Sequence, residues 1–330
     1  MTDNKIFEKE SSEKNDSFSH DKKLISALLL LLAAVVWGGA FVAQSLAGAE
    51  IGTFTFNGIR FIIGGLCILP MMPRHKLSNL AGSKENIIGA AVCGIALFLA
   101  STCQQAGIAL GADAGEAGFL TACYIIMVPI LGIFLGKKCP AKIWVAAGIT
   151  MVGLYLLCFS DVGNEGAAGG FGIAVLVGFL GNIFSWTDLL LLGCAFLFSI
   201  QIICIDRYSP RMHPITLTCT EFMVSGVLSL ICGFFFDFLP DKQGFVTSLM
   251  TPTVWISILY TGILSSAVGY TLQTVSQRKL HPAVASLIMS MESVFAAIFG
   301  WLILGQVMSV RELIGCGLIF GAIILTQVEI

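Results

Sequence analysis

Apolar residues along this chain gather in long runs that recur from about residue 24 nearly to the C-terminus. A helix needs roughly 20 apolar residues to cross about 30 Å of hydrocarbon. Ten runs meet this requirement, at residues 24–46, 53–72, 86–109, 115–136, 141–159, 186–206, 213–236, 253–275, 283–304 and 310–328. The pattern therefore predicts an all-α integral membrane protein with ten transmembrane helices.

Composition agrees with a membrane protein, because 56% of the residues are apolar and only 12% are charged. A water-soluble domain of this length does not bury so large an apolar share. Residues 1–23 are polar and carry no signal-peptide cleavage pattern, so we interpret them as a cytoplasmic tail. The eleven cysteines lack C-x-x-C spacing and all but Cys139 fall in predicted spans. We therefore expect no disulfide framework, no metal site and no cofactor.

The positions of Lys and Arg predict the orientation, because cytoplasmic loops collect these residues. With a cytoplasmic N-terminus, only Lys242 and Arg311 fall in loops on the outside. The cytoplasmic set is Lys5, Lys9, Lys14, Lys22, Lys23, Arg74, Lys76, Lys84, Lys137, Lys138, Lys142, Arg207, Arg211, Arg278 and Lys279. We expect a multi-pass protein of the cell membrane with both termini in the cytoplasm. The net charge of -2 says nothing useful about partners, and we expect no nucleic-acid partner.

The glycine-rich segment 162–185, VGNEGAAGGFGIAVLVGFLGNIFS, is the main ambiguity in this topology. Its apolar run, residues 171–180, is about half as long as a span. An eleventh crossing here would also place Arg207, Arg211, Arg278 and Lys279 outside, against the charge rule. We interpret residues 160–185 as an extracytoplasmic loop with a short interfacial or re-entrant helix.

The first five and last five predicted spans align with each other. YIIMVPILGIFLG (124–136) matches SVFAAIFGWLILG (293–305). In the second span of each half, matched positions recur at i, i+3 and i+7 on one helix stripe: Asn57, Arg60 and Gly64, then Thr218, Glu221 and Ser225. Since each half has an odd number of spans, the second half enters the membrane inverted. Inverted repeats, here 24–159 and 186–328, are typical of secondary transporters with a site near the midplane.

Several short motifs resemble those of the EamA-type branch of the drug/metabolite transporter superfamily. They are LLLLLAAVVWGGAFVAQSL, GIRFIIGGL, MESVFAAIFGWLILG and GCGLIFGAIIL, in this order along residues 24–328. The resemblance implies ten helices in two inverted repeats and secondary transport of small metabolites, often export of amino acids or related compounds. The chain departs from the family pattern at Glu292-Ser293, where the family commonly has Glu-Pro, and at Gln306, where it commonly has Glu. The bend of the ninth helix is therefore open.

Charged residues inside the spans are the first candidates for a site, because an ionisable side chain in a bilayer faces a bundle interior or a cavity. Arg60 suits a substrate carboxylate or phosphate, or else forms a structural pair with Glu221 or Glu292. The two acids are candidates for proton coupling, since their protonation could change as the site alternates. In the alternative, Glu221 neutralises Arg60 permanently and Glu292 stabilises a helix interface.

Amide and aromatic side chains complete the candidate site. Glutamine amides both donate and accept hydrogen bonds, which suits a zwitterionic ligand, although interhelical glutamine bonds also hold membrane helices together. Trp37 and Tyr124 could stack on a substrate or fill space. The predicted substrate-binding residues are Trp37, Arg60, Ser101, Gln104, Gln105, Tyr124, Glu221, Tyr270, Gln273 and Glu292.

Two glycine pairs, Gly132 with Gly136 and Gly317 with Gly321, have the spacing that lets membrane helices approach, within one chain or in a homodimer. The segment GIFLGKK (132–138) is not a phosphate loop, because its spacing is one residue short and no Ser or Thr follows the lysines. The sequence therefore predicts a non-enzymatic permease for a small polar metabolite in the lipid bilayer. The alternatives are an intramembrane enzyme on a lipid-linked substrate and a passive channel.

Overall fold

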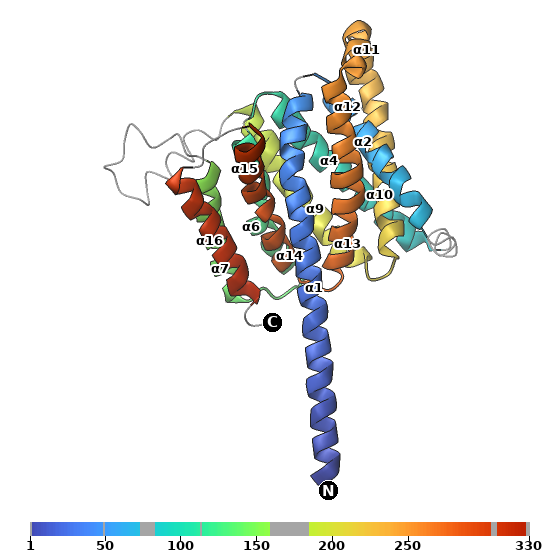
Figure 1. Cartoon of the computed structure of the whole chain (residues 1–330). Helices are drawn as coiled ribbons and strands as arrows, with labels where there is room; N and C mark the ends of the chain where they lie inside the picture. Colours follow the sequence, from blue (N-terminus) through green and yellow to red (C-terminus); the bar gives the residue numbers. More distant parts are fainter. Residues whose placement is uncertain are drawn as a thin grey trace.

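The computed structural model describes residues 2–48, 50–72, 83–112, 114–158, 185–304 and 309–327, and it is helical wherever it has regular structure (Figure 1). The elements of the first half are α1 (Thr2–Gly48), α2 (Thr53–Ile68), η1 (Leu69–Met71), α4 (Lys84–Ala109), α5 (Ala114–Ala122), α6 (Tyr124–Phe134) and α7 (Ala141–Cys158). Those of the second half are α9 (Trp186–Tyr208), α10 (Pro214–Gly233), η3 (Phe234–Phe238), α11 (Lys242–Met250), α12 (Pro252–Leu259), η4 (Tyr260–Tyr270), α13 (Thr271–Gln277), α14 (Pro282–Met289), α15 (Met291–Leu304) and α16 (Val310–Gln327).

Local sequence explains where several helices begin. Pro214, Pro252 and Pro282 occupy the first turns of α10, α12 and α14, where a missing N–H costs nothing. The side chains of Ser83 and Ser185 accept the backbone N–H three residues later and so cap α4 and α9.

Eight helices of the described part are long and apolar enough to cross a membrane: Lys22–Gly48, Thr53–Met71, Lys84–Ala109, Ala117–Phe134, Trp186–Tyr208, Pro214–Phe238, Pro252–Gln277 and Pro282–Ile303. Each coincides with a predicted span. The other two predicted spans, 141–159 and 310–328, are present as the helices α7 and α16. The chain is thus a multi-pass membrane protein, and the count of ten crossings stays a prediction. The predicted loop helix falls on residues 159–184, outside the described residues.

Large apolar side chains on the outside of the bundle are suited to lipid rather than water. Ile231, Phe234 and Phe235 are each at least half exposed on α10 and η3, with Leu302 and Ile303 on α15. In a bilayer such side chains face acyl chains as apolar as themselves. Their exposure fits the predicted lipid partner.

Helices of the first half pack mainly against helices of the second. The most extensive pairs are α2 with α10, α4 with α9, α7 with α16, and α1 with α15. The helix α1 also lies along η4, and α6 lies along α9. The pair α7 and α16 stands at one edge of the bundle (Figure 1). The interior of the molecule is therefore a contact surface between its two halves.

Glycines allow close contact between α7 and α16, but these glycines are not the pair that the sequence predicted. A Cβ at Gly153 of α7 would lie 2.8 Å from the carbonyl oxygen of Gly315 on α16. In contrast, a Cβ at Gly317 or Gly321 would meet nothing within 4 Å in the described part of the chain. The prediction that this second pair packs helices within the chain is therefore wrong, and a homodimer contact there stays a prediction.

Candidate functional site

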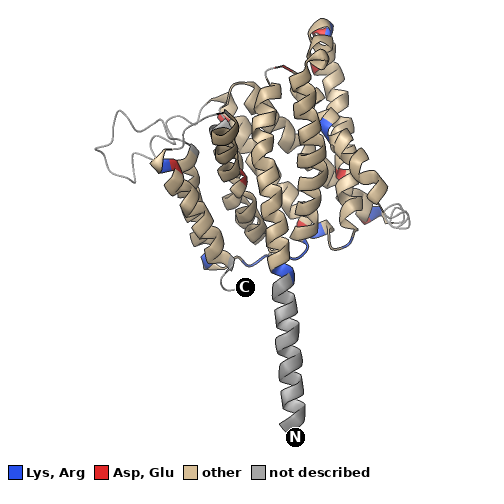
Figure 2. Cartoon of the chain, viewed as in Figure 1, with Lys and Arg blue, Asp and Glu red and all other residues tan. Residues whose placement is uncertain are grey.

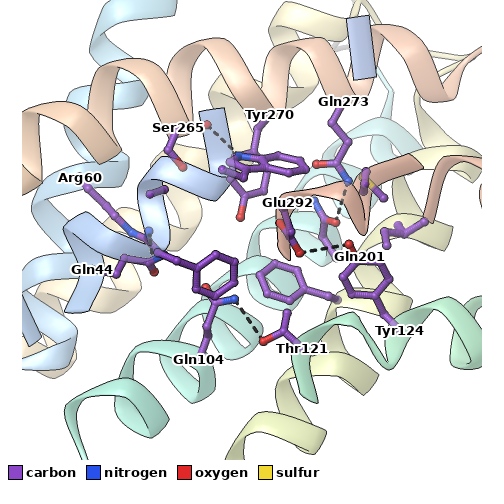
Figure 3. A pocket seen from close by; sticks show the side chains of 16 residues that line it. Gln44, Arg60, Gln104, Thr121, Tyr124, Gln201, Ser265, Tyr270, Gln273 and Glu292 are labelled. Atoms are coloured by element: carbon purple, nitrogen blue, oxygen red, sulfur yellow. Dashed lines mark hydrogen bonds between the residues drawn. The ribbon is translucent and has the colours of Figure 1, made fainter. Parts of the chain in front are cut away.

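A cavity in the middle of the bundle collects polar side chains from both halves (Figure 3). Its polar lining consists of Gln44, Arg60, Gln104, Thr121, Tyr124, Gln201, Ser265, Tyr270, Gln273 and Glu292. Its apolar lining residues are Trp37, Ala40, Phe41, Phe198, Ile202 and Met289. The volume is about 50 Å³, which by the same measure holds roughly three to five water molecules. In this conformation the cavity is central and small, with a lining that is part polar and part apolar.

Arg60 lies at one side of the cavity and has an amide, not a carboxylate, as its partner. Its Nη1 donates to Oε1 of Gln44 on α1 at 3.2 Å, and its Nε has no partner. The guanidinium carbon lies 5.4 Å and 4.7 Å from the ring centres of Phe56 and Phe61. The aromatic rings and the amide stabilise the cation only partly, so Arg60 keeps donor capacity for an anion.

Glu292 lies across the cavity from Arg60, near the junction of α14 and α15 (Figure 3). The hydroxyl of Tyr124 donates to Oε1 of Glu292 at 3.1 Å. Next to this pair, the amide of Gln104 donates to the hydroxyl of Thr121 at 3.4 Å. Acceptor and cation therefore occupy opposite sides of the cavity, an arrangement that matches the two charges of a zwitterion.

Two glutamines connect the cavity to the buried carboxyl group of Glu221. The Gln273 amide donates to Oε1 of Gln201 at 3.3 Å, and the Gln201 amide donates to Oε1 of Glu221 at 2.8 Å. Both glutamines line the cavity, but Glu221 does not, because Gln201 lies between. Glu221 is 0% exposed. It therefore belongs to a layer of polar residues behind the cavity wall.

The π-helix η4 fixes the aromatic wall of the cavity. In a π-helix the hydrogen bonds are shifted, and such segments often occur at functional sites. The carbonyl of Ser265 accepts the indole N–H of Trp37 at 3.2 Å. Gly269 makes room for the indole, since a Cβ there would lie 2.6 Å from Nε1 of Trp37. Trp37 then meets Tyr270 edge to face, with ring centres 5.1 Å apart.

Of the ten predicted binding residues, the structure brings seven together in the cavity wall: Trp37, Arg60, Gln104, Tyr124, Tyr270, Gln273 and Glu292. It places three elsewhere. Ser101 donates to the carbonyl of Leu97 on its own helix, and Gln105 donates to the carbonyl of Gln44. The third is Glu221, behind Gln201. The predicted face of α4 is thus divided: Gln104 lines the cavity, Gln105 bonds to α1, and Ser101 bonds to its own helix.

The expected ion pair between Arg60 and Glu221 or Glu292 is wrong for this structure. Arg60 lies within 4.0 Å of neither carboxylate, and its partner is Gln44. Gln44 and Gln201 were not among the predicted residues, yet they are the hydrogen-bond partners of Arg60 and Glu221. Each is the only amide side chain in its predicted span, and this was the available signal.

Comparison with known proteins gives the family. The description "EamA-like transporter family" matches this chain twice, at residues 24–159 and 185–328. An "Uncharacterized transporter" of Archaeoglobus fulgidus is 28% identical over 94% of this chain and 88% of its own length. The "Uncharacterized transporter YvbV" of Bacillus subtilis is 26% identical over 75% of this chain and 76% of its own.

A WAT1-related chloroplastic protein of Arabidopsis thaliana is 29% identical over 88% of this chain and 66% of its own length. A solved crystal structure covers 91% of this chain and 96% of its own with a TM-score of 0.67 at 17% identity, a likeness of fold. These names indicate a transporter rather than an enzyme. The two family matches together span most of the residues of this chain. This multi-pass membrane protein therefore belongs to the EamA-like transporter family.

Proposed function

We propose that this protein is a secondary active transporter, in the export direction that the family resemblance implies, for a small zwitterionic metabolite such as an amino acid. The observation that carries the proposal is the central cavity, with Arg60 on one side and Glu292 on the other. The guanidinium would bind the substrate carboxylate. The Glu292 carboxyl and nearby amides would accept hydrogen bonds from the ammonium group. Trp37, Phe198 and Tyr270 would contact the side chain.

The packing of the helices supports two inverted repeats of five. If α1 corresponds to α9, α2 to α10, α4 to α12–α13 with η4, α5–α6 to α14–α15, and α7 to α16, every major contact has a counterpart. The contacts of α2 with α10 and of α7 with α16 join equivalent helices. The contact of α4 with α9 corresponds to that of α1 with η4, and α1 with α15 corresponds to α6 with α9. Such reciprocity is expected of a two-fold axis.

Lys and Arg side chains support the proposed orientation. Most of them gather at the end of the bundle near the C-terminus, here named the basic end (Figure 2). The first span begins at Lys22 and α16 ends at Gln327 at this same end (Figure 1). By the charge rule the basic end would face the cytoplasm, with both termini there and the protein in the cell membrane.

An ion pair between the halves closes the basic end. Lys137, after α6, pairs with Asp206 near the end of α9. Both helices line the cavity nearer the midplane, through Tyr124 and Gln201. Between the cavity and the ion pair lies a buried apolar layer that includes Val128 of α6. Opening toward the basic end therefore requires separation of this pair and this layer.

His281 stands at the N-terminus of α14 close to that ion pair. Burial lowers the pKa of His281 from its ordinary value, the charge of Lys137 lowers it further, and Asp206 opposes both effects. Its Nδ1 accepts the N–H of Ala283 at 3.3 Å and caps α14. An imidazole whose Nδ1 accepts this bond is neutral, so the neutral form of His281 is the one that fits the arrangement in which Lys137 and Asp206 are paired.

These features support a mechanism of alternating access. The contracted cavity would widen when the halves rock apart at one end, admit the substrate between Arg60 and Glu292, and open at the other end after the first closes. Since about 50 Å³ is far below the roughly 300 Å³ of common ligand pockets, substrate binding and widening must occur together.

A thermal-shift screen of the purified full chain against metabolite classes tests this proposal. A ligand at 100 times its Kd stabilises the folded state by about 2.7 kcal/mol, so L-amino acids should raise the unfolding temperature. Their decarboxylated amines and their N-acetyl derivatives, each lacking one charge, should not. Gln104→Ala and Ser101→Ala form a matched pair on α4, and only the first should weaken the shift. Equal effects of the pair, or no shift with any zwitterion, would contradict the proposal.

A further inference from the structure

Glu221 is the buried acid that the substrate cavity does not use. Its Oε1 accepts the Gln201 amide, whereas its Oε2 has no hydrogen-bond partner. Within the described part of the chain, no Lys or Arg nitrogen lies within 4.0 Å of its carboxyl group. A carboxylate at this depth without a cation is strongly disfavoured. The surroundings therefore suit a carboxyl group that carries a proton.

The titratable groups that face Glu221 are themselves uncharged when protonated. Cys93 of α4, Cys204 of α9 and Tyr270 of η4 are the ones within electrostatic reach. Arg60 of α2 directs its guanidinium to Gln44 instead. Among the described residues, no cation on the helices packed around α10 therefore lies within 4.0 Å of Glu221 to compensate a negative charge.

Ser225 supplies a partner that fits both states of this acid. It lies at i+4 from Glu221, on the adjacent turn of α10, it is 0% exposed, and its hydroxyl has no partner. A protonated Glu221 can donate through Oε2 to the Ser225 oxygen, and an ionised Glu221 can accept from the Ser225 hydroxyl. Neither oxygen has a hydrogen-bond partner in the structure, so a side-chain rotation that brings them together would satisfy both atoms before and after a proton transfer.

Further unpartnered polar atoms continue from Ser225 toward the end of the bundle opposite the basic end. Ser229 lies one more turn along α10, is 0% exposed and has no partner for its hydroxyl. On α2, Oδ1 of the buried Asn57 also has none, while its amide donates to the carbonyl of Ser101. Gly58 of α2 contacts Leu230 of α10. Asn57 and Ser229 are the residues next to this contact, so their side chains lie at the same level of the bundle. Buried polar atoms of this kind usually bind water.

We propose that Glu221 and Ser225 form a proton-binding site separate from the substrate cavity, reached by water along Ser229 and Asn57. A hydronium ion transfers its proton to Oε2 of Glu221 and leaves as water, and a water molecule accepts the proton on release. The coupling part of this proposal rests on the proposed transport function. Gln201 provides the link, because its amide contacts Glu221 and its carbonyl oxygen contacts Gln273 in the cavity wall.

Infrared difference spectra of the purified full chain between acidic and alkaline pH test the site without any substrate. The carbonyl stretch of protonated carboxyl groups should include a band that Glu221→Gln removes and Glu292→Gln leaves in place. Ser225→Ala should retain this band at a shifted frequency, because the proposed hydrogen bond from protonated Glu221 to Ser225 can no longer form. A spectrum of Glu221→Gln identical to that of the wild type would overturn the site, as would an unshifted band in Ser225→Ala.

Proteoliposomes test the coupling. The readout is the accumulation of a radiolabelled mixture of L-amino acids with a pH gradient, divided by that without one. The ratio should exceed one several-fold in the wild type and fall to one in Glu221→Gln. A wild-type ratio in Glu221→Gln would overturn the coupling role. If the wild type moves no amino acid at all, the proposed function fails, and the infrared bands still decide whether Glu221 binds the proton.

Discussion

Breaking the ion pair between Lys137 and Asp206 should weaken the closed state of the basic end. The pair joins the two halves of the chain, and its side chains are 33% and 16% exposed. Substitution of either residue by alanine leaves the other charge in a partly buried place. Substitution of both removes the charges together, so the double variant should lose little more than either single variant.

The exposure of the pair sets the magnitude. Fully exposed pairs contribute about 0.2–1 kcal/mol, and breaking a fully buried pair costs about 3–5 kcal/mol. Because this pair is intermediate, we expect a coupling energy of about 1–2 kcal/mol. A shift of 1.4 kcal/mol changes a two-state equilibrium tenfold, so a difference of this size would move the balance between closed and open forms measurably.

The chain provides a matched control for this experiment. Arg211 and Glu85 also join the two halves, at 2.9 Å, but their side chains are 53% and 77% exposed. The four variants of each pair would be unfolded in mixed micelles by titration with a denaturing detergent, and the coupling energy taken from each double-mutant cycle. We expect a coupling well below 1 kcal/mol for the control pair.

Additive losses at Lys137 and Asp206, within about 0.5 kcal/mol, would refute the inference that these residues hold the halves together. Equal coupling energies for the two pairs would refute the argument from burial. Recovery of stability in the exchanged variant, Lys137→Asp with Asp206→Lys, would separate a pairwise contact from a general effect of net charge.

Two further predictions follow from the same structure. Because folding lowers the pKa of His281, the unfolded chain binds a proton first as the pH falls through about 6.5, and the stability of the fold should decrease there. His281→Gln should therefore flatten the pH dependence of the unfolding temperature. An unchanged profile in this variant would contradict the argument. Gly153→Ala should destabilise the fold by about 1–3 kcal/mol, because the new Cβ would lie 2.8 Å from the Gly315 carbonyl oxygen. Gly148→Ala on the same helix is the control, since a Cβ there would meet no described atom within 4 Å. In the same unfolding assay it should be neutral or slightly stabilising.

The positions of the helices were predictable because a bilayer imposes one length on every span. The predicted range 186–206 is the helix Trp186–Tyr208, and 253–275 is the continuous helical stretch from Pro252 to Gln277. The π-helix inside that stretch was not predictable, since its shifted hydrogen bonds leave no apolar period to detect. It matters, because it supplies the Ser265 carbonyl that holds Trp37.

Residue type predicted which side chains lie near the cavity, but not which direction each one takes. Gln104 and Gln105 are adjacent on α4, and both are buried. A step of one residue turns a side chain by about 100° around a helix, so one of them lines the cavity and the other bonds to the backbone of α1. Only the crossing angles of the neighbouring helices decide between them, and these depend on contacts far apart in the sequence.

The alignment of Arg60 with Glu221 suggested an ion pair, but in the structure the two residues occupy equivalent places in the two halves and do not contact each other. Arg60 on α2 bonds to Gln44 on α1, and Glu221 on α10 bonds to Gln201 on α9. Since α1 and α9 are the first helices of the two halves, each of these ionisable side chains is hydrogen-bonded to a glutamine of its own half. A central ion pair would tie the halves together and would have to break in every transport cycle. Because Arg60 and Glu221 are bonded separately, no ion pair between them ties the halves together at the midplane. The ion pairs between the halves in the described part of the chain stand at the basic end, where Lys137 and Asp206 can separate into water.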